Sequence, residues 1–275
     1  MKIDTFKVER WMNEYEDDAV YNLAETCIDS LTLDELFKLA GIDGDEFLLS
    51  LKDKKMTYGD IFGSTAFKDG VASLYEDIRP EQVIPTHGAI GANNMVIMSL
   101  IEPGDNMISV MPTYQQHYSI PASIGAEVRI HQLTYENKFL PDIEKLAGQV
   151  DEKTKMITIN NPDNPTGSWI PMETMKEIVK IAESVGAYVL CDEVYRGISE
   201  DGSYMHSIVD IYDKGISVGS MSKIFSLAGL RMGWIVSPCE EVLEACHIRR
   251  DYDTISCGAI DDMLASLALQ HKDKI

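Results

Sequence analysis

Short β-rich runs alternate with helical patterns along this chain from about Thr86 onward. Apart from the alternating Ala126–His131, these runs are largely apolar, which is typical of strands buried on both faces in a mostly parallel sheet. The β-rich runs are Asn106–Met111, Ala126–His131, Lys155–Asn160, Ala187–Cys191, Gly215–Gly219 and Gly233–Val236. Strands that alternate with helices in this way predict an α/β domain built in layers.

Apolar residues at a 3.6-residue spacing predict helices between most of these runs. Two of the patterns open with prolines, which suit the first turn of a helix. The patterns are Asn93–Ile101, Pro141–Val150, Pro171–Val185 and, near the end of the chain, Cys257–Gln270. Before Thr86 the signal is weaker, but Leu31–Gly41 also predicts a helix. Thr32 is its expected N-cap, Glu35 completes a capping box and Gly41 ends it.

Charge and cysteine content exclude several classes of protein. With 45 acidic against 24 basic residues the formal net charge is -21, which repels nucleic-acid phosphates and anionic membrane surfaces. The five cysteines are odd in number and show no CxxC pairing, so we expect neither a disulfide framework nor a metal site. No run approaches membrane-spanning length, and the first residues lack the apolar core of a signal peptide. We expect a cytoplasmic protein without nucleic-acid or membrane partners.

The strongest local signal is a lysine followed by an arginine among small residues. The segment Ser220–Lys223 directly follows an apolar run, and Arg231 lies eight residues after Lys223. It resembles the Schiff-base lysine region of the class I/II aminotransferases, which use pyridoxal 5′-phosphate (PLP). The resemblance implies that Lys223 holds PLP as an internal aldimine and that Ser220 and Arg231 bind its phosphate, with Ser222 among the cofactor-binding residues. A solvated lysine in a loop is the alternative.

Two other turns resemble cofactor-binding segments of the same family. Gly88, Ala89 and Ile90 lie in a turn of small residues before a helix, where backbone N–H groups can approach a phosphate. Tyr114 follows a predicted strand, and in the family an aromatic residue here covers one face of the pyridine ring. A simple strand-to-helix connection and a core tyrosine are the alternatives. His117 has no evident partner and is assigned no role.

Three residues that follow strands resemble those that bind the ring. Asn164 lies in an Asn-Pro-Thr-Gly turn, and the resemblance implies that it donates to the ring oxygen O3′ and that the bond into Pro165 is cis. Asp192 ends a buried run, where a bare carboxylate is costly unless it meets a cation such as a protonated ring nitrogen. By resemblance, Tyr195 joins Asn164 at O3′. A generic turn and a helix-capping aspartate are the alternatives.

The order of these elements makes the resemblance specific. Six of them, from Tyr58 to Arg231, occur in the family's sequence order, and the resemblance spans about residues 50 to 270. Tyr58, the least specific, resembles a tyrosine that reaches the phosphate of a neighbouring subunit, which implies a homodimer. The implied fold is a three-layer aspartate aminotransferase-like large domain with a mostly parallel sheet. Lys223, Asp192 and Tyr195 are the implied catalytic residues.

The resemblance implies a PLP-dependent aminotransferase that moves an amino group between an amino acid and a 2-oxo acid. The same lysine and ring serve β-lyases, synthases, cyclases and oxidases on this fold, so another PLP reaction stays open. A non-catalytic PLP-binding sensor is a third possibility, although no helix-turn-helix segment precedes Tyr58. The segment from Phe6 to Thr26 is dense in acidic and aromatic residues, which favours a solvated acidic helix because charge runs usually face water. A basic amino-acid substrate bound near this segment is the alternative.

The two ends of the chain carry expectations about domains. Residues 1–45 are expected to belong to a small domain or to cap the pocket, and residues 46–275 to form the PLP-binding large domain. Family members continue into a carboxyl-terminal small domain that supplies an arginine for the substrate's α-carboxylate. The chain stops at Ile275, five residues after the last helical pattern. We therefore expect an incomplete small domain and a chain that is part of a longer protein, with low turnover by itself.

Overall fold

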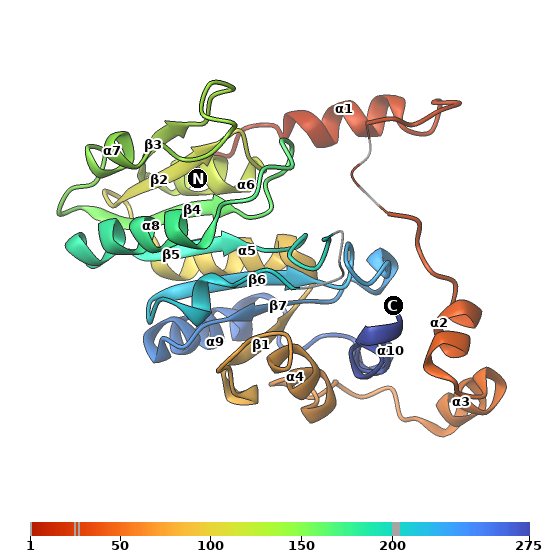
Figure 1. The fold of residues 1–275 in the computed structure, drawn as a ribbon. Helices are drawn as coiled ribbons and strands as arrows, with labels where there is room; N and C mark the ends of the chain where they lie inside the picture. Colours follow the sequence, from red (N-terminus) through yellow and green to blue (C-terminus); the bar gives the residue numbers. More distant parts are fainter. Residues whose placement is uncertain (1, 25, 27, 200–203) are drawn as a thin grey trace.

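One sheet organises the molecule (Figure 1). The computed structural model describes residues 2–24, 26, 28–199 and 204–275, and within them seven strands pair in the order β1-β7-β6-β5-β4-β2-β3. The strands are β1 (Val83–Thr86), β2 (Asn106–Met111), β3 (Glu127–Gln132), β4 (Thr154–Asn160), β5 (Tyr188–Asp192), β6 (Gly215–Ser220) and β7 (Gly233–Val236). β7 is antiparallel to both of its neighbours, and the other neighbouring pairs are parallel. The predicted mostly parallel sheet is confirmed.

All six predicted strands are present. β2 and β7 have the predicted bounds, and the other four differ from prediction by at most one residue at either end. β1 has no clear sequence signal, because it is four residues long and contains Pro85. Proline lacks the N–H that a central strand needs, and β1 lies at an edge of the sheet, where this loss is tolerated.

Helices connect the strands and cover both faces of the sheet (Figure 1). The α-helices are α1 (Lys7–Tyr15), α2 (Leu33–Ala40), α3 (Gly44–Ser50), α4 (Thr65–Ala72), α5 (Gly88–Leu100), α6 (Gln116–Ile124), α7 (Ile143–Ala147), α8 (Met172–Val185), α9 (Glu240–Asp253) and α10 (Ala259–Gln270). Short 3-10 helices are η1 (Leu51–Asp53), η2 (Pro80–Gln82), η3 (Ile208–Asp210), η4 (Ala228–Leu230) and η5 (Lys272–Lys274).

Two hydrophobic clusters lie on opposite faces of the sheet. Successive side chains of a strand alternate between faces, so in β4 Met156 joins one cluster while Ile157 and Ile159 join the other. The cluster that contains Met156 packs against α5 and α9, and the other against α2, α4, α7, α8 and α10. Burial of each such side chain contributes about 1.5–3 kcal/mol. The result is the predicted three-layer α/β fold.

Helix ends follow the predicted capping chemistry at α2 and differ at two other helices. Thr32 caps α2 in a capping box with Glu35, and Gly41 ends the helix in the left-handed conformation. The prediction that prolines form the first turns is wrong. Pro171 has extended backbone and is itself the N-cap of α8. α7 begins only after Asp142, whose side chain accepts a hydrogen bond from the Lys145 N–H.

The segments before β1 lie in two places. α1 projects away from the sheet near α6, whereas α2 lies beside α10 and α3 lies beside α2 (Figure 1). Leu36 and Phe37 of α2 belong to the same hydrophobic cluster as the sheet. The predicted division of the chain at residue 45 stays a prediction.

The cysteines form no disulfide within the described part of the chain. Cys191, Cys239, Cys246 and Cys257 are free thiols there, and Cys27 lies outside the described residues. No described helix is both long enough and apolar enough to cross a bilayer.

Candidate active site

The carboxyl ends of β4, β5 and β6 lie side by side at one edge of the sheet. β4 and β5 pair in parallel, so Asn160 lies opposite Asp192, and β6 is the next parallel neighbour. The segments that follow these three strands carry Asn164, Tyr195 and Lys223. The topology therefore gathers four of the predicted site residues where α/β sheets bind ligands.

Asp192 is a buried carboxylate held by two donors. Its side chain is only 7% exposed. Asn93 Nδ2 donates to Oδ2 at 2.7 Å, and the Val194 N–H donates to Oδ1 at 3.2 Å. Burial raises the pKa of Asp192, while the two hydrogen bonds and the charge of Lys223 oppose that rise. Because a buried bare charge is costly, this carboxylate is suited to meet a cation.

His117 lies beside Asp192, although its sequence context assigns it no role. Its side chain is 0% exposed, and Nε2 is 3.9 Å from Asp192 Oδ2. Nδ1 lies 3.3 Å from Thr113 Oγ1. Burial lowers the pKa of His117 to about 4, so the ring is neutral at pH 7 and the contact is not an ion pair.

Asn93 is the second residue of this site without a sequence signal. It is buried on α5, in the face that packs against the sheet. Asn93 Oδ1 and His117 Nε2 are both buried without a hydrogen-bond partner among the residues that the structure describes. Unpaired buried polar atoms are rare and call for an explanation, such as a bound polar group.

Lys223 and Tyr195 belong to the same group of side chains. Lys223 Nζ is 5.9 Å from the centre of the Tyr195 ring. The Tyr195 hydroxyl donates to Thr26 Oγ1 at 3.1 Å. Since the charge of Lys223 also acts on Asp192, the amine, the phenol and the buried carboxylate form one cluster.

Asn164 is positioned by the strand end that precedes it. Its N–H donates to Asn160 Oδ1 at 2.7 Å, and Asn160 Nδ2 donates to the Asp192 carbonyl at 2.8 Å. The bonds into Pro162 and Pro165 are both cis, which confirms the expectation for Pro165.

A second group of predicted cofactor-binding residues lies beside β1, β7 and β6. The register aligns Thr86, Gly233 and Ser220 across these three strands. A Cβ on Gly233 would lie 2.5 Å from the carbonyl carbon of Gly88, so only glycine permits the turn at Gly88 to approach so closely. This approach brings the predicted phosphate-binding turn, Gly88–Ile90, next to β7.

Arg231 lies over this turn. A Cβ on Gly88 would come within 3.0 Å of Arg231 Nη2, and Gly88 itself has a φ of +69°. Arg231 has a φ of 52°, a left-handed conformation that costs a non-glycine residue roughly 1–2 kcal/mol. Such strain tends to occur at functional sites.

The start of α5 and two serines complete this second group. The N-cap residue His87 makes no side-chain capping hydrogen bond, so it leaves the first N–H groups of α5 available to a ligand. Ser220 is buried at the end of β6, and its Oγ accepts a hydrogen bond from the Ser222 N–H at 3.3 Å. Small residues, open N–H groups and a guanidinium together suit an anion.

Tyr114 follows β2 and contacts residues near the amino terminus. Its hydroxyl donates to Glu9 Oε1 at 2.9 Å, and its ring centre is 4.9 Å from that of Phe6. Burial and the carboxylate of Glu9 raise the pKa of Tyr114. The contact with Glu9 joins parts of the chain far apart in sequence, so no local motif indicates it.

Tyr58 lies at the surface, apart from the residues described above. Its side chain is 72% exposed in the segment between η1 and α4. The role expected for it in a neighbouring subunit stays a prediction.

Comparison with known proteins identifies the family. The sequence profile of the family described as aminotransferase class I and II matches residues 13–270. The chain belongs to this family. A PLP-dependent aminotransferase from Streptococcus suis, whose crystal structure is known, is 48% identical in sequence and superposes with a TM-score of 0.95. The superposition covers 100% of this chain and 72% of the Streptococcus suis chain.

Two other similar proteins are more distant in sequence. Capreomycidine synthase from Streptomyces vinaceus is 27% identical over 98% of this chain and 68% of the enzyme. Aspartate aminotransferase from Thermotoga maritima is 28% identical over 82% of this chain, which spans only 62% of that enzyme. A crystal structure of an aspartate aminotransferase from the same organism is 25% identical in sequence and has a TM-score of 0.82. The superposition covers 97% of this chain and 71% of the Thermotoga maritima chain. The predicted aspartate aminotransferase-like fold is confirmed.

Proposed function

We propose that this chain binds PLP along the edge of the sheet, with the phosphate at Gly88–Ile90 and the ring nitrogen at Asp192. Buried Asn93 Oδ1 and His117 Nε2, unpaired among the described residues, support a polar group beside Asp192. The close approach of the Arg231 guanidinium to Gly88 supports the binding of an anion, such as the cofactor phosphate, at the end of the site away from Asp192. The two halves of the site therefore fit the two charged ends of PLP.

The phosphate end uses backbone as well as side chains. The first N–H groups of α5 and the positive end of its dipole favour an anion. Arg231 adds a guanidinium that can donate two parallel hydrogen bonds, and Ser220 and Ser222 add hydroxyls. In a chain of net charge -21, such a local cationic site is distinctive.

The ring end depends on keeping Asp192 ionised in a buried place. Asn93 and the Val194 N–H donate to its two oxygens, which favours the charged form. The ionised carboxylate would then stabilise a proton on the nitrogen of a bound pyridine ring. Neutral His117, 3.9 Å away, adds no competing charge.

Lys223 is the proposed base of the reaction. PLP supplies an aldehyde that takes up the amino group and a ring that accepts electrons from the substrate's α-carbon. Lys223 would hold the resting cofactor covalently, and its amine would take the proton from the substrate's α-carbon and return it. Tyr195 and Asn164 would donate hydrogen bonds to the cofactor's ring oxygen, and Tyr114 would cover one face of the ring.

The proposed reaction is the transfer of an amino group between an amino acid and a 2-oxo acid. The observation that carries it is the cluster of Lys223 with buried Asp192, in a chain whose profile match is to aminotransferases. A different PLP reaction is the second candidate, because capreomycidine synthase matches 98% of the chain. A homodimer and a cytoplasmic location remain part of the proposal.

Product analysis tests the proposed reaction. The purified protein with PLP is incubated with single amino acids and an isotopically labelled 2-oxo acid, and products are identified by mass spectrometry. A new amino acid that carries the label is expected, since only transamination makes it. Other products without the labelled amino acid would favour the second candidate, and no product from any amino acid would contradict both.

Replacing Asn93 by leucine is expected to weaken PLP binding about tenfold or more. The change removes a donor to a charged group, a hydrogen bond usually worth about 1.5–3 kcal/mol. Titration of the cofactor-free protein with PLP, followed by absorbance, measures the dissociation constant. The control is Asn94→Leu, at the next position on α5, which should bind PLP as the native protein does. Equal affinities of both variants would contradict a role for Asn93 at Asp192.

A further inference from the structure

The segment that precedes α1 is fixed against the candidate site. Gln115, which is only 5% exposed, accepts a hydrogen bond from the Lys7 N–H at 2.9 Å and donates one to the Thr5 carbonyl at 2.9 Å. Phe6, between them, packs against the Tyr114 ring. Two reciprocal hydrogen bonds and a ring contact therefore set the position of residues 5–7, and with it the start of α1.

Glu9 is the charged group that this segment presents to Tyr114. The Tyr114 hydroxyl donates to Glu9 Oε1 at 2.9 Å. This bond uses one of the roughly four lone-pair positions of a carboxylate. No salt bridge to Glu9 occurs within the described part of the chain, although Lys7 and Arg10 lie on the same helix. Glu9 therefore retains the capacity to pair with a cation.

The chain returns to the same site after α1. The Tyr195 hydroxyl donates to Thr26 Oγ1 at 3.1 Å, so residues on both sides of the α1 segment contact the two tyrosines of the candidate site. Besides burial and Glu9, the carboxylate of Asp192 raises the pKa of Tyr114, so Tyr114 also lies near Asp192. Glu9 and Thr26 therefore both contact tyrosines that lie next to the place proposed for the cofactor ring.

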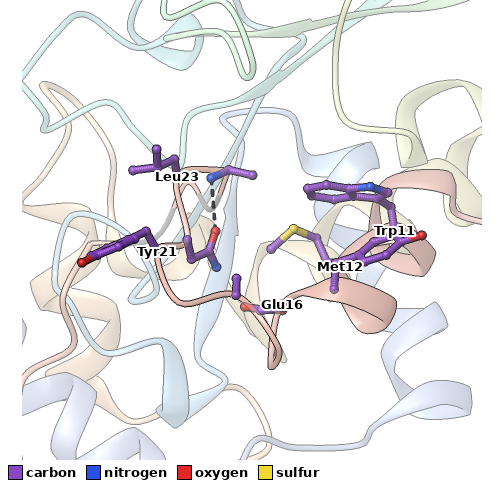
Figure 2. A pocket seen from close by; sticks show the side chains of 9 residues that line it. Trp11, Met12, Glu16, Tyr21 and Leu23 are labelled. Carbon is purple, nitrogen blue, oxygen red and sulfur yellow. Dashed lines mark hydrogen bonds between the residues drawn. The ribbon is translucent and has the colours of Figure 1, made fainter.

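A pocket of about 400 Å³ lies between α1 and the returning segment (Figure 2). Figure 2 shows Trp11 and Met12 on the α1 side, and Tyr21 and Leu23 on the other. Glu16 is the acidic residue in its lining. Glu9 precedes the α1 residues of this lining and is not part of it. Aromatic faces such as those of the lining attract a guanidinium or an ammonium group.

We propose that Glu9 recognises the far end of the substrate's side chain, and that the substrates are amino acids with a cationic side chain. This inference rests on the proposed function, since the substrate's amino group must be held at Lys223. A neutral side chain would leave the carboxylate of Glu9 without a cation, and an acidic side chain would be repelled by it. A guanidinium is the better match, because its planar fork donates two parallel hydrogen bonds to a carboxylate.

A matched pair of ligands tests the proposal without turnover. Arginine and citrulline have nearly the same shape, but citrulline has a neutral end. The protein loaded with PLP is titrated with each, and the change in absorbance of the bound cofactor gives the dissociation constants. Arginine is expected to bind about tenfold more tightly than citrulline, and Glu9→Gln is expected to bring the ratio to about 1. Lysine against norleucine repeats the comparison for an ammonium group.

Glu14→Gln is the control, because Glu14 is an exposed glutamate on the same helix. This variant should keep the native preference for arginine. Equal binding of arginine and citrulline by the native protein would overturn the proposal, as would a preference that survives in Glu9→Gln. If no amino acid changes the absorbance at all, the proposed function fails together with the inference, which is a distinct result.

Discussion

Replacing Lys223 by alanine is expected to abolish covalent retention of PLP and to lower amino-group transfer by about 10²–10⁴-fold or more, the usual contribution of one positioned proton-transfer group. Two tasks are expected to be lost together, because Lys223 is proposed both to bond the resting cofactor and to move the α-proton. Borohydride reduction followed by peptide mapping measures the first, and the yield of labelled amino acid measures the second. Folding should survive, since Lys223 lies in a turn after β6 and is not part of the hydrophobic core.

Lys214→Ala is the matched control for this experiment. Lys214 immediately precedes β6, at the opposite end of the strand from Lys223, and its Nζ donates to the Gly186 carbonyl at 2.8 Å. This variant should keep both the reduced label on Lys223 and the reaction. Label on another lysine of the native protein would refute the assignment of Lys223.

The strands could be predicted from sequence where burial alone decides their composition. β2 and β4 are buried along nearly their whole length, so their apolar runs are visible without knowledge of their neighbours. β1 could not be predicted in this way, because its four residues include Pro85 and depend on pairing with β7, far along the chain. Its role emerges only from the register, which places Thr86 beside Gly233.

The candidate site residues also differ in whether their surroundings are local in sequence. Lys223, Asp192 and Asn164 lie in short motifs directly after strands, so their surroundings are local in sequence. Asn93 and His117 reach Asp192 from α5 and α6, and their positions result from the packing of these helices. An asparagine or a histidine on a helix is ordinary in a sequence. Only the buried contacts with the carboxylate distinguish these two.

Glu9 illustrates a further limit of sequence reasoning. The acidic and aromatic composition of the first residues fits both a solvated helix and part of a binding site. The contacts of Gln115 with the backbone of Thr5 and Lys7 decide where the segment lies. Such contacts involve backbone groups that every residue has, so the amino-acid types of the segment do not reveal them.

The residue after Asp192 has a separate, structural task. Glu193 is buried, and its carboxylate accepts hydrogen bonds from Ser207 Oγ at 2.9 Å, the Ile208 N–H at 2.9 Å and Ser217 Oγ at 2.8 Å. Arg196 Nε lies 3.0 Å from Glu193 Oε2. The Arg196 side chain is 5% exposed and the Glu193 side chain 2%. Consecutive carboxylates thus serve the site and the fold.

Replacing Arg196 by methionine is expected to lower the free energy of unfolding by about 3–5 kcal/mol, because it leaves the Glu193 charge buried without a cation. Arg196 also donates to the carbonyls of Met205 and Leu74, at 3.0 and 2.9 Å, and stacks over the Tyr75 ring at 4.3 Å. Methionine fills part of this space but donates no hydrogen bond. Urea unfolding followed by circular dichroism measures the loss.

The size of this loss should depend on pH. Burial raises the pKa of Glu193, and Arg196 opposes the rise, so the variant carries a higher pKa than the native protein. A carboxyl with a raised folded-state pKa costs stability above that pKa, and protonation removes the cost as pH falls. The difference between native and variant should therefore shrink on acidification.

An exposed ion pair provides the comparison that isolates burial. Lys176 Nζ lies 2.9 Å from Glu173 Oε1, but the two side chains are 49% and 85% exposed. Lys176→Met should lose only a small fraction of what Arg196→Met loses, because water already compensates both charges. A second variant, Arg196→Met with Glu193→Leu, removes both buried charges and should recover part of the stability. If the single Arg196 variant unfolded at the same urea concentration as Lys176→Met, the buried pair would have no such role.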